Sequence, residues 1–267
     1  MAENNKRRKK KKKRKNKKLI VSAAAFITAA ATVVFCLYYI YFKTDFFDLK
    51  SVDIKGNSVY DYSYIMEKAE IELGKKIFSI DRKQAEEKLK SEVYVKDARA
   101  VYELPDKISL KITERIEKYQ IPINNEYILI DDEGIVLRKS IEKFDLLTIE
   151  SSTHVVYNIG DTVQFEGIES NDTIFKSIEF LNSEFGSETI RKTIAEDNNS
   201  LLFETEYGAM VKINLGDDIE YQIVFAMKII NDRLNNNLTV ISGLIDFTKG
   251  DSPVYIEDFK LEEQLNE

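Results

Sequence analysis

The chain has few of the residues that most often carry chemistry: among 267 residues there is one cysteine, one histidine and no tryptophan. A single cysteine cannot form a disulfide within the chain, and no Cys/His cluster exists that could bind zinc. The sequence also lacks a glycine-rich loop of the kind that cradles phosphates, and a tryptophan on which a sugar could stack. We therefore expect neither a metal nor a cofactor.

The catalytic candidates that remain are isolated. His154 is the only base available to a histidine-dependent triad, and the serines beside it are too close in sequence to face it. Residues 140–143 match the Ser-x-x-Lys pattern of penicillin-binding enzymes, but the other motifs of that set are missing. The acidic pairs at 131–132 and 217–218 lack the spacing of a calcium loop and suit turns or helix starts. These features predict a binding protein and not an enzyme.

Charge divides the chain into three segments. Residues 6–18 hold twelve lysines and arginines, interrupted only by Asn16. Residues 19–42 contain no charged residue at all. From Lys43 onward there are 27 basic and 45 acidic residues, a formal balance of −18 that the whole-chain value of −7 hides. The pattern indicates a basic tail, an apolar segment and an acidic folded part.

The apolar segment, LIVSAAAFITAAATVVFCLYYIYF, is long enough to cross a bilayer core of roughly 30 Å at about 1.5 Å per helical residue. A cleaved signal peptide is the competing interpretation, because Ala29 and Ala31 imitate its cleavage site. Ten further apolar or aromatic residues follow without a polar break, which favours a retained transmembrane helix. Cys36 lies inside this segment and is expected to be an apolar filler.

The basic run predicts the orientation of that helix. Positive flanks stay cytoplasmic, so we expect residues 1–18 inside the cell and residues 43–267 outside it, on a protein of the cell membrane. The run contains no aromatic residue and no turn chemistry, which argues against nucleic-acid binding. Its second expected role is contact with anionic lipid, so membrane lipid is the predicted contact of residues 6–42.

The chain after the apolar segment is predicted to begin with a small mixed unit. SVDIKGN alternates apolar and polar residues and stops at Gly56-Asn57, as a strand before a turn does. Two amphipathic helical patterns follow, with Asp61 and Asp81 as their caps. Residues 95–102 and 107–112 then have strand patterns around a Pro-Asp turn. The predicted order is strand, helix, helix, strand, strand.

The following part is richer in predicted strands. Residues 127–130 and 135–137 flank an acidic turn, and residues 240–247 and 254–256 are expected to end the unit as strands. Between them lie two amphipathic helical patterns. The fold class is therefore α+β, with five expected parts: a cytoplasmic tail (1–18), a transmembrane helix (19–42), a small mixed domain (43–116), a β-rich domain with two helices (117–258) and an acidic tail (259–267).

Several motifs carry a family resemblance. GN after the first strand, GKKIFSID between the helices and VKDARAVYELPDKISLKITER at the end resemble a POTRA domain. A POTRA domain directly outside one membrane span, behind a basic tail, is similar to the FtsQ/DivIB family of bacterial cell-division proteins. YILIDDEGIVL, MVKINLG and IDF…PVY resemble the β domain of that family, whereas EKYQIPINNEY departs from its more apolar pattern.

The resemblance implies a non-enzymatic scaffold at the division septum, which links cytoplasmic and extracytoplasmic parts of the division machinery. In this family the late strands bind a small coiled-coil membrane protein of the FtsB/DivIC type, and a second partner of the FtsL type joins. An exposed sheet edge can accept such a strand. The corresponding partner-binding residues here are Ile245, Phe247, Thr248, Val254, Tyr255 and Ile256.

Two alternatives stay open. Tyr255 and Phe247 are the preferred anchors, because aromatic side chains dominate binding hot spots. Ile245 and Phe247 could equally face the core and only hold the sheet together. At the level of function, the alternative is a membrane-anchored cell-wall enzyme or regulator that uses the POTRA-like unit for targeting.

Overall fold

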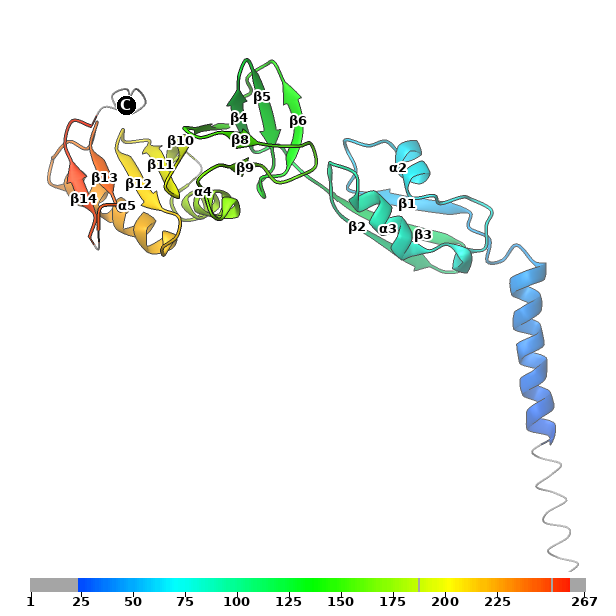
Figure 1. Cartoon of the computed structure of the whole chain (residues 1–267). Helices are drawn as coiled ribbons and strands as arrows, with labels where there is room; N and C mark the ends of the chain where they lie inside the picture. Colours follow the sequence, from blue (N-terminus) through cyan, green and yellow to red (C-terminus); the bar gives the residue numbers. More distant parts are fainter. Residues whose placement is uncertain (1–23, 187, 251, 260–267) are drawn as a thin grey trace, which may run out of the picture. The chain divides into compact units, whose positions relative to one another are not determined.

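The computed structural model describes residues 24–186, 188–250 and 252–259. The basic run at 6–18, the first residues of the apolar segment and most of the acidic tail lie outside this part of the chain. Two compact units are distinguished (Figure 1): the first holds the described residues up to Ser91 and Asp97–Glu114, and the second holds Glu92–Lys96 and the described residues from Arg115 onward. The elements of these units confirm the predicted α+β class.

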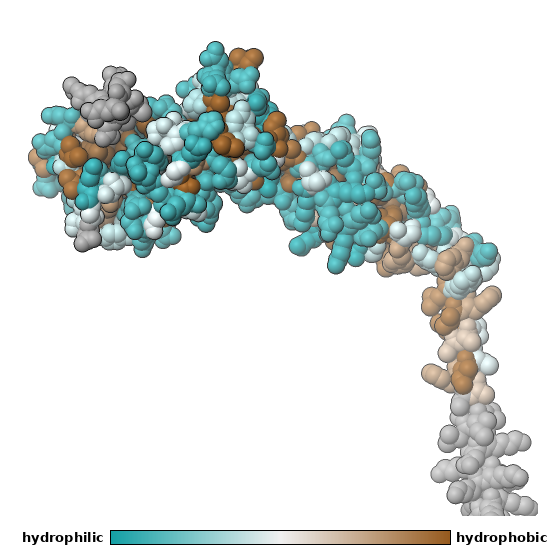
Figure 2. Space-filling model, viewed as in Figure 1, coloured by the Kyte–Doolittle hydropathy of each residue, from teal (hydrophilic) through white to brown (hydrophobic). Residues whose placement is uncertain are grey.

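An apolar helix runs over Ala24–Lys43. Its 20 residues rise about 30 Å, which matches the hydrocarbon core of a bilayer. Apolar side chains are present on every side of it, and Figure 2 shows it as brown and tan. It is the one helix among the described residues that is long and apolar enough to cross a membrane.

The first unit has a three-stranded sheet with two short α-helices. The sheet order is β1-β3-β2, and β1 lies parallel to β3. Both helices begin where a carboxylate caps them: the Tyr64 amide donates to Asp61 (2.7 Å) and the Gln84 amide donates to Asp81 (3.2 Å). The elements are β1 (Ser51–Lys55), α2 (Tyr62–Lys68), the 3-10 turn η1 (Ile77–Ser79), α3 (Arg82–Lys90), β2 (Val95–Glu103) and β3 (Lys107–Glu114).

The second unit is built on one nine-stranded sheet. Three neighbouring pairs are parallel (β4/β7, β7/β10 and β12/β13), and the other pairs between these strands are antiparallel. In order of pairing, the strands are β14 (Val254–Ile256), β13 (Leu244–Asp246), β12 (Met210–Asn214), β11 (Ser200–Thr205), β10 (Ile190–Glu196), β7 (Leu147–Ser151), β4 (Tyr119–Ile123), β5 (Glu126–Ile130) and β6 (Val136–Ser140).

Two helices, α4 (Asn171–Phe185) and α5 (Ile219–Asn235), cover one face of this sheet between β10 and β14 (Figure 1). Their apolar sides and the facing strand residues form a single large core, to which Phe175 of α4, Phe203 of β11 and Ile223 of α5 belong. A small second sheet pairs β8 (Val155–Val156) with β9 (Gln164–Phe165). The helix-covered face is therefore the main hydrophobic core of the unit.

One predicted strand is shorter than the sequence pattern indicated. Residues 240–247 were expected to be extended, but β13 covers only Leu244–Asp246. The chain turns before it: the Gly243 amide donates to the Val240 carbonyl (3.0 Å), and Ser242 has a φ of +59°. The first half of the apolar pattern is therefore a turn, and Val240 is buried in the core from that turn.

Candidate partner-binding edge

The last strand, β14, lies at one end of the sheet order. Its three residues pair with β13 in an antiparallel register that sets Tyr255 opposite Ile245 and Val254 opposite Asp246. Among the described residues no strand pairs with its other side. An edge of this kind carries backbone N–H and C=O groups that a further strand can pair with. We call this side of the sheet the β14 edge.

Side chains on β14 alternate between the two faces of the sheet. Tyr255 lies on the same face as Ile245, whose side chain is fully buried, and it packs against the main core. Val254 and Ile256 lie on the opposite face and are 43% and 37% exposed. The β14 edge therefore presents two apolar side chains to solvent on the face without helices.

Arg233 of α5 attaches β14 to the rest of the unit. Its guanidinium carbon lies 3.9 Å from the centroid of the Tyr255 ring, a cation–π contact. Its Nη2 lies 3.3 Å from an oxygen of Glu257, and its Nε donates to the Thr239 carbonyl (3.2 Å). One arginine therefore holds the ring and the residue after β14 against the end of the helix.

Gly243 leaves the space into which Tyr255 fits. A Cβ atom at this position would lie 2.1 Å from the Tyr255 hydroxyl oxygen and 2.7 Å from the carbon that bears it. Any larger residue would force the ring to move, and β14 with it. Sequence reasoning identified neither Gly243 nor Arg233, because both act through a strand that is distant in the chain.

The structure divides the six predicted partner-binding residues into three groups. Ile245 is fully buried and Phe247 is 8% exposed, and both belong to the core. Thr248 is exposed, but its amide (2.8 Å) and hydroxyl (2.6 Å) both donate to the buried carboxylate of Asp246. The remaining three form β14 itself: Val254, Tyr255 and Ile256.

The opposite end of the sheet, β6, is protected. The Val136 amide donates to the Asp161 carbonyl (2.9 Å), and the Gly160 amide donates to the Val136 carbonyl (2.8 Å), so a neighbouring segment covers its start. Arg138 further along β6 forms an ion pair with Glu117 (2.7 Å). Charged side chains and covering segments are the usual protection of sheet edges. By contrast, β14 has no charged residue in its three positions.

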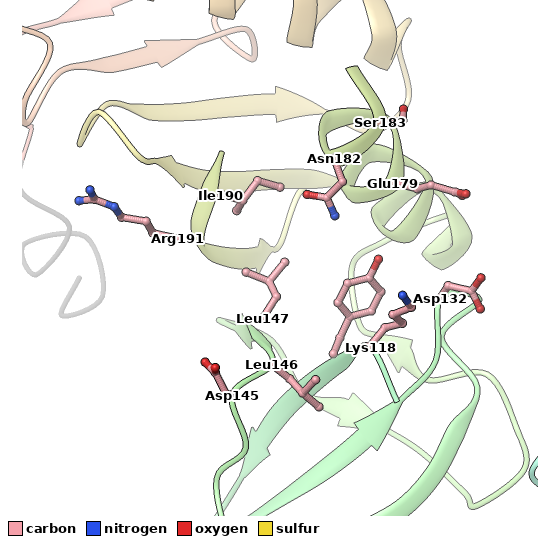
Figure 3. Close-up of a pocket in the computed structure, with 11 residues that line it drawn as sticks. Lys118, Asp132, Asp145, Leu146, Leu147, Glu179, Asn182, Ser183, Ile190 and Arg191 are labelled. Atoms are coloured by element: carbon pink, nitrogen blue, oxygen red, sulfur yellow. The ribbon is translucent and has the colours of Figure 1, made fainter. Parts of the chain in front are cut away.

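A hollow of about 660 Å³ lies elsewhere in the second unit, among the starts of β4, β7 and β10 and the end of α4 (Figure 3). Two cationic side chains, Lys118 and Arg191, and three carboxylates line it together with polar groups of α4. Its carboxylates are Asp132, Asp145 and Glu179. The lining therefore carries charge of both signs, with one more carboxylate than cationic groups.

The hollow has the chemistry of a hydrogen-bonding surface. Burial and the nearby Asp132 and Glu179 raise the pKa of Tyr119 to about 12, so its phenol stays protonated at neutral pH. No histidine or cysteine lines it. Within the described residues, no group of three or more His, Cys, Asp or Glu side chains could hold a metal ion.

Among the isolated catalytic candidates, the histidine lies on the surface and two aspartates stabilise a turn and a helix start. His154 is exposed, and its carbonyl accepts from the Glu166 amide (3.0 Å). Asp131 is fully buried, and the amides of Glu133 (2.9 Å) and Ile135 (2.8 Å) donate to it, so it shapes the turn between β5 and β6. Asp218 caps α5 by accepting from the Tyr221 amide (3.0 Å). The two aspartates thus have the turn and cap positions that the sequence predicted.

The comparisons with known proteins match one domain family and several proteins named as cell division proteins. Residues 47–115 match the family described as POTRA domain, FtsQ-type. Cell division protein DivIB of Clostridium botulinum (strain Hall) is 28% identical over 226 residues, 80% of this chain and 84% of the relative. Cell division protein DivIB of Clostridium tetani is 29% identical over 128 residues, 47% of this chain and 48% of that relative. Cell division protein FtsQ of Rickettsia bellii is 32% identical over 98 residues, 37% of each chain.

Proposed function

Because the chain belongs to the FtsQ/DivIB family of cell-division proteins, we propose that it is a membrane-anchored scaffold of the division machinery, without catalytic activity, whose β14 edge binds another membrane protein. The partner is a small coiled-coil protein of the FtsB/DivIC type, and a protein of the FtsL type joins the complex. The basic tail faces the cytoplasm, both folded units lie outside, and the protein gathers at the septum.

The observation that carries this proposal is the difference between the two ends of the sheet. The start of β6 is covered and its middle is charged, whereas β14 pairs on one side only and exposes Val254 and Ile256. A strand added along β14 gains main-chain hydrogen bonds, and apolar side chains of the partner can pack on the two exposed residues. Tyr255, Ile245 and Phe247 hold the edge in place from the core side.

Membrane anchoring supports a contact of this size. A three-residue strand offers few hydrogen bonds, so its affinity in free solution is expected to be low. When both proteins are anchored in the same membrane, the effective concentration of one site near the other rises, and a weak contact becomes sufficient. The apolar helix Ala24–Lys43 is the segment that provides this anchoring.

The proposal is tested by recovering partners with the full-length protein from detergent-solubilised membranes. Val254→Asp and Ile256→Asp each place a charge on the exposed face of β14, and we expect at least a tenfold loss of the small coiled-coil proteins that co-purify. The control is Val156→Asp, because Val156 of β8 is also about half exposed (48%) and lies outside the β14 edge. Full recovery with both β14 variants would refute the site.

A second experiment separates a scaffold from the alternative of a cell-wall enzyme or regulator. Cells depleted of the protein are expected to stop dividing, and the Val254→Asp protein is expected to restore division poorly. Normal division after depletion, together with altered wall turnover, would contradict the scaffold function.

A further inference from the structure

The linker between the apolar helix and the rest of the first unit is very short. The helix ends at Lys43, and Phe47 already belongs to the fold, because the Ile77 amide donates to its carbonyl (2.8 Å). Residues 44–46 alone separate the two. Four steps along the chain span at most about 14 Å. With the helix in a membrane, Phe47 is therefore held within that distance of the charged helix end.

Several apolar side chains are exposed at the end of the unit where β1 begins. The Gly74 amide donates to the Leu49 carbonyl (2.8 Å), which brings the preceding Leu73 to this end. The Lys50 amide donates to the Asp106 carbonyl (2.8 Å), which brings the turn between β2 and β3 there as well. The four apolar residues at this end are between 48% and 59% exposed: Phe46, Leu73, Phe78 and Leu104.

Ring contacts connect the two exposed phenylalanines of this end through Phe47. The Phe47 ring centroid lies 5.0 Å from that of Phe46 and 5.6 Å from that of Phe78, and Phe78 lies 5.6 Å from Tyr102. A groove of about 490 Å³ runs beside Phe78 and Tyr102. Aromatic residues of this kind are favoured where a membrane meets water.

Two cationic side chains line the same groove. The guanidinium carbon of Arg82 lies 3.9 Å from the Tyr102 ring centroid, and its Nη1 donates to the Ala100 carbonyl (3.1 Å). Lys83 is exposed at the rim of the groove. Long cationic side chains beside apolar surface can lie along the membrane and direct their charge to lipid phosphates.

We propose that this end of the first unit is a lipid-contact surface. Phe46, Leu73, Phe78 and Leu104 enter the interfacial layer of the leaflet nearest to Lys43, and Lys83 reaches the phosphate groups. The linker favours lipid over a protein partner as the occupant, since it holds the surface at the membrane without any other component. The balance of 14 basic and 14 acidic residues in 47–115 means that an anionic leaflet does not repel the unit as a whole. This contact is independent of partner binding at β14.

The proposal is tested with the full-length protein in vesicles of phosphatidylcholine and phosphatidylglycerol. Replacing Cys36 by serine removes the only native cysteine. A Leu73→Cys substitution then carries an environment-sensitive fluorophore. A Val59→Cys substitution is the matched control, because Val59 is 50% exposed and follows β1 at its far end, about 17 Å along the strand. Lipids with a nitroxide in the head group quench fluorophores that lie in the interface.

We expect quenching of the label at position 73 to be at least threefold stronger than at position 59. The double variant Phe46→Ser/Phe78→Ser should reduce it to the level of position 59, whereas Val59→Ser with the same label should leave it unchanged. Hydrogen exchange of β1 and β3 peptides verifies that each variant is folded. Equal quenching at the two labels, or no effect of the double variant, would overturn the proposal.

Two further experiments test the contact of Lys83 with phosphate groups and distinguish lipid from protein as the occupant of the surface. The Lys83→Gln variant should make quenching at position 73 less dependent on the fraction of phosphatidylglycerol; unchanged dependence would overturn the assignment of Lys83 to phosphate groups. If the label at 73 is exposed to water in vesicles that contain only this protein, and becomes shielded when solubilised membrane proteins are co-reconstituted, the surface binds a protein and the lipid proposal is wrong.

Discussion

Two regions of the chain after the linker carry charge in different ways. Residues 47–115 have 14 basic and 14 acidic residues, whereas residues 116–267 have 12 basic and 30 acidic ones. The negative surplus of residues 47–267 therefore belongs to the second region. The negative surplus favours a basic partner for the second region, so its proposed contact at β14 should weaken with added salt, whereas the lipid contact proposed for the first region depends mainly on apolar side chains.

Both regions fix a turn with a glycine at positive φ and a carboxylate that accepts backbone amides, Glu114 for the loop after β1 and Asp131 for the turn after β5. They differ in burial, because Asp131 is fully buried and forms an ion pair with Arg115. Removing each device tests whether this difference is real. The expected losses of stability decrease in the order in which the variants are described below.

The largest loss is expected for Arg115→Ala in the second unit. Arg115 forms an ion pair with Asp131, whose side chain is fully buried, and contacts Glu133 (2.7 Å). Without the arginine, a buried carboxylate lacks its cation, which costs about 3–5 kcal/mol of unfolding free energy. Urea-dependent hydrogen exchange of second-unit peptides measures it. Arg138→Ala is the control: its side chain is 39% exposed, so we expect about 1 kcal/mol or less. Equal losses would contradict the comparison.

Gly56→Ala should destabilise the first unit by about 3 kcal/mol. Gly56 has a φ of +86°, and a Cβ there would lie 2.1 Å from the Ile112 carbonyl oxygen, a backbone atom that cannot move aside. Gly74→Ala measures the cost of the backbone conformation without a steric clash. Gly74 has a φ of +84°, but no neighbouring atom lies within 4 Å of its Cβ position. Its loss should be about 1 kcal/mol. The same exchange experiment on peptides of β1 and β3 measures both, and similar values would exclude the steric explanation.

Glu114→Gln should cost about 1–2 kcal/mol at neutral pH. The Glu114 carboxylate accepts from the Ser58 amide (2.8 Å) and hydroxyl (2.6 Å) and from the Val59 amide (3.0 Å). Burial alone would raise the pKa of Glu114, but these hydrogen bonds outweigh it, so the pKa is lowered.

The pH dependence of Glu114 follows from that direction. A lowered carboxyl pKa stabilises the folded unit above the unfolded value of about 4.3, and this contribution is lost as the pH falls through the folded pKa. First-unit stability of the natural protein should therefore fall more steeply in acid than that of Glu114→Gln. Parallel curves would show that the carboxylate does not hold the loop by its charge.

The smallest effect concerns two tyrosines of the second unit. Burial, followed by the hydrogen bond to Glu117, raises the pKa of Tyr94 to about 12, and burial raises that of Tyr119 to the same value. Their contribution to stability is complete below about pH 10 and is lost as the pH rises through 12. Tyr94→Phe/Tyr119→Phe should remove a late step from the phenolate absorbance titration and leave the phenolate absorbance at neutral pH unchanged. A late step that persists would assign it to other tyrosines.

The sequence was sufficient for the helices, because their signals are local. Asp61, Asp81 and Asp218 each precede an amphipathic pattern and each caps a helix. The strand, helix, helix, strand, strand order of the first unit followed from the same signals. By contrast, the parallel pairing of β7 with β10 joins residues more than 40 positions apart, and nothing in either segment specifies its neighbour.

The site could be predicted as a segment but not as a surface. Alternation in residues 254–256 implies two faces, yet only the pairing of Tyr255 with Ile245 decides which face meets the core. The turn that shortens β13 depends on Ser242 at positive φ. Serine does not favour this conformation, so the sequence does not predict it. Arg233 approaches Tyr255 only once α5 has packed, so no local pattern could reveal it.

The three-residue linker limits how far the first unit can lie from a membrane that holds the apolar helix. Four chain steps reach at most about 14 Å, so a partner anchored in the same membrane, as proposed above, would meet a binding site on this unit close to the bilayer. Lengthening the linker at Thr44 by one or two turns of helix is expected to weaken such contacts without altering either surface.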